Sequence, residues 1–118
     1  MRKLIVIVSF LLMPLAPSVA LAHAFLDHAT PLVGSTVPAA PHEVALWFTQ
    51  SLEPAFSSVE VTDASGARVD DGKAAVSGNT MRIGLKSVAP GTYRVRWHAL
   101  SVDTHTTEGS FTFHVGSP

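Results

Sequence analysis

The chain has 118 residues, no cysteine, and eight Lys and Arg against nine Asp and Glu, a formal net charge of −1. A chain of this length has room for one hydrophobic core, which argues against a second domain. The lack of cysteine excludes disulfides, thiolate metal sites and thiol catalysis, and the lack of a basic cluster argues against nucleic acid or anionic membranes as partners.

Residues 1–22 have the pattern of a cleaved export signal. Arg2 and Lys3 precede an apolar run over 4–12, and small residues stand at Ala20 and Ala22. The run is well short of the roughly 20 residues that cross a bilayer as a helix. We therefore expect a signal peptide over 1–22, followed by an exported, periplasmic domain over 23–118 with a net charge of −3 and no membrane anchor.

His23 is the first candidate ligand, although its role depends on where the signal is cut. Overlapping small-x-small triplets leave three cleavage positions open, before Leu21, before His23 and before Phe25. Only the second makes His23 the first residue of the domain. Its free α-amine and its Nδ1 atom then belong to one residue and can close a chelate ring on a metal ion.

After the signal, short alternating segments separated by turn residues predict an all-β fold. In 44–48, 80–85, 92–100 and 110–115, apolar side chains recur every second residue, as expected of strands that bury one face. The strand over 44–48 is apolar on both faces and is expected to be central. We expect a small Greek-key β-sandwich or barrel of about seven strands with immunoglobulin-like dimensions.

Two further local predictions concern a hairpin and a methionine. The Asp63-Ala64-Ser65-Gly66 turn predicts a hairpin between the strand around Val59 and a strand over 67–69. Met81 shares a face with Ile83 and Leu85 and is expected in the core, not as a metal ligand.

A polar loop over 101–109 separates the last two predicted strands and contains Asp103 and His105. If the backbone there is extended, their i, i+2 spacing points a carboxylate and an imidazole to the same side. Such a triplet alone is a weak sign of a metal site, because a solvated loop with a local hydrogen bond has the same pattern. The triplet becomes much more specific in combination with an N-terminal histidine.

At these residues the chain resembles the CopC family of periplasmic copper-binding proteins. Members begin the mature protein with histidine and carry an Asp-x-His-x-x-x-Gly motif before the last strand, which Asp103, His105 and Gly109 fit. The resemblance implies a small barrel of the cupredoxin-like or immunoglobulin-like kind that takes one Cu(II) per chain. It further implies the ligands His23 (amine and Nδ1), Asp103 (one carboxylate oxygen) and His105 (imidazole).

Three nitrogens and one oxygen in a plane suit Cu(II), which supports this ligand set on chemical grounds. The resemblance implies copper sequestration, transfer or resistance. We expect binding without catalysis, and a monomer, because nothing in the sequence argues for a dimer. Its protein partner would be an inner-membrane copper importer or a periplasmic multicopper oxidase. Many relatives have glutamate where this chain has Gln50, and often proline where it has Thr106, and neither difference removes a predicted ligand. The 70–77 segment lacks the methionines of relatives that also bind Cu(I), which favours Cu(II) alone.

Two other functions remain open on sequence grounds. One is a copper monooxygenase-like enzyme with a histidine brace, which also uses an N-terminal histidine and a second imidazole. The other is a metal-free immunoglobulin-like binding domain, for which the strand pattern alone is sufficient. The remaining histidines, His28, His42, His98 and His114, are expected to be ordinary residues, with His28 near enough to the site to modulate it.

Overall fold

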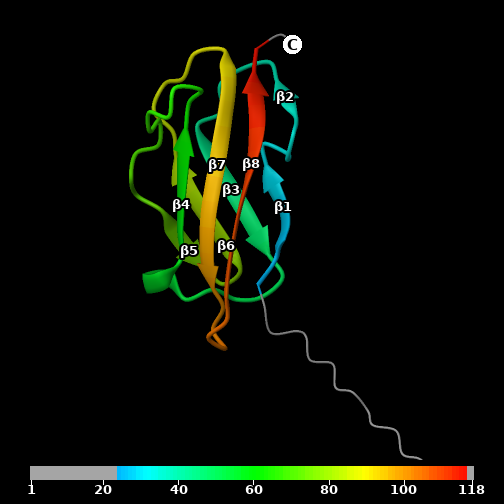
Figure 1. The fold of residues 1–118 in the computed structure, drawn as a ribbon, viewed down its shortest axis with the longest axis vertical. Coiled ribbons are helices and arrows are strands. Elements are labelled where there is room, and N and C mark those ends of the chain that lie inside the picture. The colour runs from blue at the N-terminus through cyan, green and yellow to red at the C-terminus, as the bar shows by residue number, and fades with distance from the viewer. Residues whose placement is uncertain (1–23, 117–118) are drawn as a thin grey trace, which may run out of the picture.

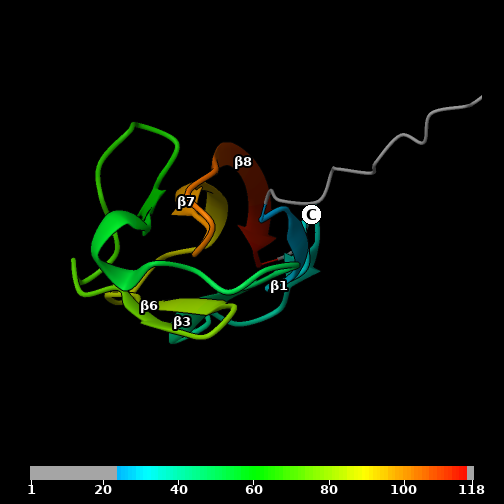
Figure 2. The same ribbon diagram turned by 90° about the horizontal axis from the view of Figure 1, so that it is seen from below.

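The computed structural model describes residues 24–116, so the predicted signal peptide over 1–22 and His23 lie outside the described residues. The described chain forms a sandwich of two four-stranded sheets (Figure 1), which are seen as two layers in the end view of Figure 2. The first sheet has the order β1 (Leu26–Thr30), β3 (Glu43–Phe48), β6 (Thr80–Gly84) and β5 (Ala75–Ser77). The second has the order β2 (Thr36–Val37), β8 (Thr106–Val115), β7 (Gly91–Leu100) and β4 (Ser58–Thr62).

This architecture confirms the predicted all-β sandwich, with eight strands in the described residues instead of about seven. Strand pairing is antiparallel except between β2 and β8, which run parallel. A 3-10 turn, η2 (Pro54–Phe56), precedes β4. Within residues 24–116, no helix has the length and apolar character needed to cross a membrane.

The core lies between the sheets and follows from the period-two patterns. On β7, Tyr93, Val95, Trp97 and Ala99 are buried while the residues between them are exposed. The facing sheet contributes Leu46, Phe48, Met81 and Ile83, each at most 2% exposed. The prediction that Met81 belongs to the core is therefore confirmed. Burying one such side chain contributes about 1.5–3 kcal/mol.

β3 is central, as predicted, because it pairs with β1 on one side and β6 on the other. Its pairing with β1 shifts by one residue between Leu26 and His28. Such a bulge reverses the side to which the following side chains point. Ala29 consequently faces the core, and the His28 ring stacks on Trp47 with centroids 4.5 Å apart.

Two sequence predictions need correction. The turn at 63–66 forms, but 67–69 does not make a full strand and joins β4 through the single bridge Thr62–Arg68. The last strand begins at Thr106 and not at Ser110, because β8 stays in register with β7 up to the pair Leu100–Thr106. Hence the polar loop is shorter than predicted, and all of 106–109 is paired sheet.

Asp70 explains why 67–69 leaves the regular sheet. Its carboxylate is buried and accepts hydrogen bonds from the backbone N–H groups of Val61 (2.7 Å) and Gly72 (2.9 Å). Two further bonds come from the Arg68 guanidinium, at 2.8 and 3.1 Å. Burial alone raises the pKa of Asp70, but these hydrogen bonds outweigh burial and hold the pKa below its usual value.

Replacing Asp70 with asparagine should destabilise the fold by about 2–3 kcal/mol at neutral pH, because the new amide NH2 faces groups that are themselves donors. The lowered pKa means that the carboxylate stabilises the fold above the unfolded-state pKa of about 4. That contribution is lost as the pH falls through the folded-state pKa.

Urea unfolding of the wild type and of Asp70→Asn at pH 7 and below pH 4 measures this effect. The difference in unfolding free energy should shrink in acid, and an equal difference at both pH values would refute the role given to Asp70. Asp71→Asn, which changes the exposed neighbour, serves as the control.

Candidate metal centre

The candidate site lies on the turn that joins β7 to β8. The backbone N–H of Ser101 donates to the carbonyl of His105 (3.0 Å), and that of Thr104 donates to the carbonyl of Ser101 (2.8 Å). Thr104 has a φ of 74°, a left-handed conformation that is uncommon for a non-glycine residue. The turn is therefore tight, and its backbone is not extended between Asp103 and His105.

Asp103 and His105 nevertheless converge, as predicted, although through this turn. The Asp103 Oδ1 and His105 Nδ1 atoms are 3.4 Å apart, and the two side chains are 47% and 48% exposed. An oxygen and a nitrogen donor thus lie together where an ion from solvent can reach them.

Ser101 holds this pair in place through hydrogen bonds. It is fully buried, its hydroxyl donates to Asp103 Oδ1, and it lies 3.3 Å from the backbone N–H of His105. Sequence reasoning missed this residue. The signal was present, since Ser101 continues the inward series of β7 after Trp97 and Ala99, and a buried hydroxyl needs hydrogen-bond partners.

The hydrogen bond from Ser101 is the main reason that the pKa of Asp103 lies below its usual range. Partial desolvation opposes this effect, and the hydrogen bond to His105 supports it. Asp103 is therefore a carboxylate at neutral pH, which is the form that can bind a cation.

The start of the described chain lies beside this turn. The Thr107 hydroxyl, two residues after His105, donates to the carbonyl of Ala24 at 2.6 Å. Phe25 and Thr49 exchange two hydrogen bonds of 2.9 Å, between their backbones and through the Thr49 hydroxyl. Figure 1 shows that β1 begins at the same end of the sandwich as the β7–β8 turn.

A third segment, 49–52, completes this end of the molecule. The backbone N–H of Val102 donates to the carbonyl of Ser51 (3.1 Å), and Leu52 pairs with Ser101. Gln50 belongs to this segment and is half-buried. The chain start, 49–52 and 101–107 are therefore joined to one another by hydrogen bonds.

The structure brings two of the three predicted ligands together, Asp103 and His105. The third, His23, lies outside the described residues and immediately precedes Ala24. Among residues 24–116, no group of three or more His, Cys, Asp or Glu side chains is arranged to hold a metal ion.

The other histidines take structural positions. His28 pairs with Asp27 (2.7 Å) as well as stacking on Trp47, and His114 is hydrogen-bonded to Thr92 (2.9 Å). His98 and His42 are exposed, on β7 and before β3. The modulating role considered for His28 gains no support, because its described contacts are with Asp27 and Trp47.

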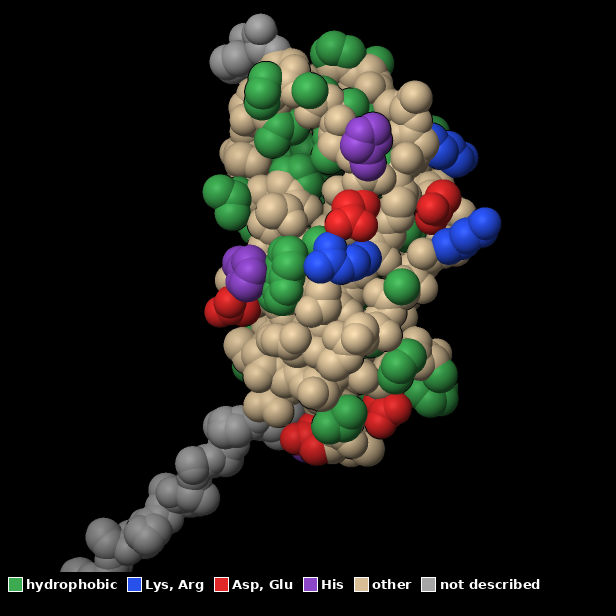
Figure 3. Space-filling model, turned by 180° about the vertical axis from the view of Figure 1, so that it is seen from behind, with side chains coloured by type: hydrophobic (Ala, Val, Ile, Leu, Met, Phe, Trp, Pro, Cys, Tyr) green, Lys and Arg blue, Asp and Glu red, His purple; other side chains and the backbone are tan. Residues whose placement is uncertain are grey.

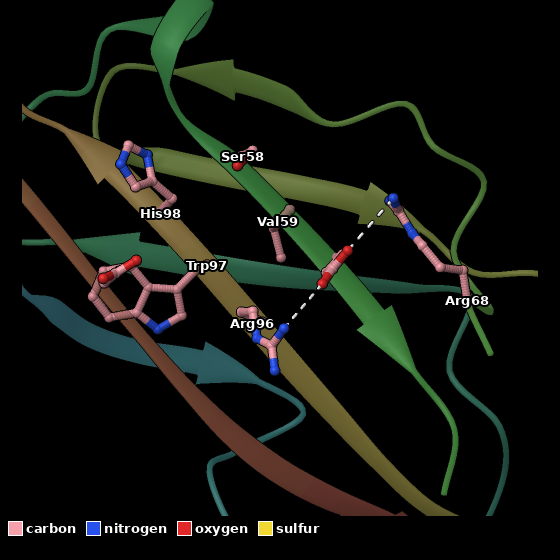
Figure 4. A pocket seen from close by; sticks show the side chains of 8 residues that line it. Ser58, Val59, Arg68, Arg96, Trp97 and His98 are labelled. Atoms are coloured by element: carbon pink, nitrogen blue, oxygen red, sulfur yellow. Dashed lines mark ion pairs between the residues drawn. The ribbon is translucent and has the colours of Figure 1, made fainter. Parts of the chain in front are cut away.

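A shallow hollow lies on the outer face of β4, β7 and β8 (Figure 4). At its centre Glu60 lies between Arg68 and Arg96, at 3.5 and 3.6 Å. Two guanidinium groups beside one carboxylate make a poor site for a cation, and neither Asp103 nor His105 lines the hollow. The candidate metal ligands thus lie on an exposed turn and not in a pocket.

Comparison with known proteins identifies the family of this chain. The CopC domain family matches residues 26–116, which is most of the chain. The chain belongs to the CopC family. Copper resistance protein C of Pseudomonas syringae pv. tomato is 38% identical over 110 residues, which cover 86% of each chain. Copper transport protein CutJ of Bacillus subtilis (strain 168) is 30% identical over 114 residues, which cover 93% of this chain but only 21% of CutJ.

A solved structure shows the same CopC fold. The crystal structure of PcoC, described as a methionine-rich copper resistance protein from Escherichia coli, superposes with a TM-score of 0.71 at 34% identity. The superposition covers 80% of this chain and 99% of PcoC.

Gly109, the last residue of the family motif, packs against the core. A Cβ atom at this position would lie 2.7 Å from Cζ2 of Trp97, which is itself held edge-on against Phe48 with ring centroids 5.0 Å apart. The indole therefore has little freedom to move away, and only glycine fits beneath it.

Gly109→Ala should consequently destabilise the fold by about 1–3 kcal/mol, as expected of an overpacked core. Urea unfolding followed by tryptophan fluorescence measures the loss. Ser110→Ala, at the exposed neighbouring position, should change stability little. Unchanged stability of Gly109→Ala would show that Trp97 can repack.

Proposed function

We propose that this protein binds one Cu(II) ion per chain and carries it for sequestration, transfer or resistance in the periplasm, without catalysis. The ligands are the α-amine and Nδ1 of His23, a carboxylate oxygen of Asp103 and the imidazole of His105. Copper is the cargo of this protein. The proposal requires removal of residues 1–22, so that the domain over 23–118 begins with a free amine at His23.

The main support is the bond between Thr107 and Ala24 beside the Asp103–His105 pair. Consecutive Cα atoms are 3.8 Å apart, so the residue before Ala24 has little distance to cover to the turn. A ligand set assembled in this way loses little chain entropy on binding, because the turn and the chain start are fixed by hydrogen bonds beforehand.

The donor chemistry favours Cu(II) over other ions. Nitrogen-rich sites with one carboxylate follow the stability order of divalent metals, at the top of which Cu(II) stands. The one methionine after residue 22, Met81, is fully buried, and there is no cysteine, so soft ligands for Cu(I) are not available. In this respect the chain differs from PcoC, which is described as methionine-rich.

The relatives' names support a role in copper handling. Two of them are called copper resistance protein C and copper transport protein, which favours copper over a metal-free binding domain. Residues 1–22 support export. A monomer that passes copper to an inner-membrane importer or a multicopper oxidase fits these features best.

A histidine-brace monooxygenase is the main rival function. Asp103 argues against it, because a carboxylate in the copper plane occupies a position that oxygen needs. Peroxide-driven cleavage of a polysaccharide by the copper-loaded protein would favour the rival.

Adding one glycine before His23 in the processed protein should weaken Cu(II) binding on the order of 100-fold or more, because the amine and Nδ1 no longer belong to one residue. Competition with a chelator of known affinity measures the change, and electron paramagnetic resonance should show altered nitrogen coordination. Removing the glycine with a protease should restore binding. Equal affinity with and without the glycine would contradict the role of the amine.

Replacing His105 with alanine should weaken Cu(II) binding by more than about 100-fold, since even the loss of a residue that only supports a ligand costs 10–100-fold. His42→Ala, at an exposed histidine before β3, is the matched control and should bind like the wild type. Equal losses in both variants would show that copper binds histidines of the surface without selectivity.

A further inference from the structure

An exposed apolar turn lies next to the candidate ligands. All three residues of η2 (Pro54–Phe56) are exposed, and Phe56 has 64% of its surface accessible. Val102, which directly precedes Asp103, is 53% exposed. Large apolar side chains are usually buried, and a cluster at one place on the surface marks an interaction site more often than scattered ones do.

Hydrogen bonds fasten this apolar turn to the turn that carries the ligands. Glu53 N–H donates to the carbonyl of Leu100 (2.8 Å), Leu100 N–H donates to the Ser57 hydroxyl (3.1 Å), and Val102 N–H donates to the carbonyl of Ser51 (3.1 Å). The segments 51–57 and 100–102 therefore form one rigid unit. A protein that contacts Phe56 and Val102 has Asp103 within the same contact area.

The carboxylates of this unit are Glu53 and Asp103, and two imidazoles lie beside them, His105 next to Asp103 and His98, whose Nδ1 is 3.3 Å from the Phe56 carbonyl oxygen. Glu53 and Asp103 flank the apolar side chains, and neither 49–57 nor 100–107 contains Lys or Arg. Figure 3 shows acidic and hydrophobic side chains at this end of the molecule, whereas the Lys and Arg side chains in view lie on its upper part. Because Asp103 binds copper in the loaded protein, a matching surface has an apolar centre and a basic side chain opposite Glu53.

We propose that Glu53, Pro54, Phe56 and Val102, beside the ligand Asp103, form a docking face for a copper-accepting protein that presents an apolar contact with a basic side chain opposite Glu53. This inference rests on the proposed function, because transfer requires that the acceptor reach the metal ligands. A second copy of this chain fits poorly, since the acidic side chains of two such faces would repel. The small size of the face suits a transient encounter.

In one relative, the region similar to this chain is part of a longer polypeptide. The matching region makes up 21% of CutJ, so about four fifths of that copper transport protein is additional polypeptide.

The first experiment maps the contact in cells. A photo-crosslinking amino acid replaces Phe56, or, as a matched control, Leu32, which is 62% exposed but follows β1. Crosslinks from position 56 to a copper-binding protein, absent from position 32, are expected. Equal yields at both positions, or crosslinks only to a second copy or to lipid, would overturn the proposal.

The second experiment measures transfer from the Cu(II)-loaded protein to the crosslinked acceptor and, separately, to EDTA. Phe56→Ser and Glu53→Lys should each slow transfer to the acceptor about tenfold, the effect of losing one strong interface contact. Transfer to EDTA should stay unchanged, and Leu32→Ser should behave like the wild type. Equal rates to the acceptor in all variants would refute the docking face.

These results are separable from a failure of the proposed function. Cu(II) stoichiometry is measured first for the wild type and every variant. A wild type that binds no Cu(II) refutes the proposed function itself, whereas normal binding with unaltered transfer refutes only the docking face.

Discussion

The hydrogen bond between the Thr107 hydroxyl and the Ala24 carbonyl is the constraint on which the candidate site depends. It joins residues 83 positions apart and links the chain start, which leads into the first sheet, to β8 of the second. A single hydrogen bond contributes only about 0.5–1.5 kcal/mol net, so it cannot hold the two sheets together. The packed core must do that, and Ala24, itself fully buried, belongs to that core. The position of the chain start is thus a consequence of sheet packing.

The position of the turn that carries Asp103 and His105 also follows from packing of the core. Ser101 is the last inward residue of the β7 series, and its hydroxyl reaches both Asp103 and the backbone of His105. Because Ser101 cannot leave the core without exposing apolar surface, the two side chains above it are held near each other by the protein alone. The left-handed Thr104 shows that the backbone of this turn is constrained rather than relaxed.

Sequence alone predicted the strands in which apolar residues alternate, including β3 and β7, because sheet packing requires that pattern. It did not locate the start of β8, since the exposed Thr106 and Glu108 and the intervening Thr107 carry no apolar alternation and pair only through the register set by β7. It paired Asp103 with His105 on the assumption of an extended backbone. The pair forms through a positive φ at Thr104, which threonine rarely adopts and no local pattern indicates. The prediction for His23 concerns a residue outside the described part.

The carboxylates on the faces of the sandwich have different partners from those at the end that carries the candidate ligands. On the faces, acidic groups are matched by arginines, as with Glu43 and Arg82 (2.7 Å) and with Glu60 between Arg68 and Arg96. At the end, Glu53 and Asp103 lie on segments without Lys or Arg. Asp103 is paired with the imidazole of His105 (3.4 Å) and not with a guanidinium, so its carboxylate stays available to a cation. A cation that approaches the described chain therefore meets a carboxylate and an imidazole at this end, whereas Glu43 and Glu60 on the faces are already engaged by arginines.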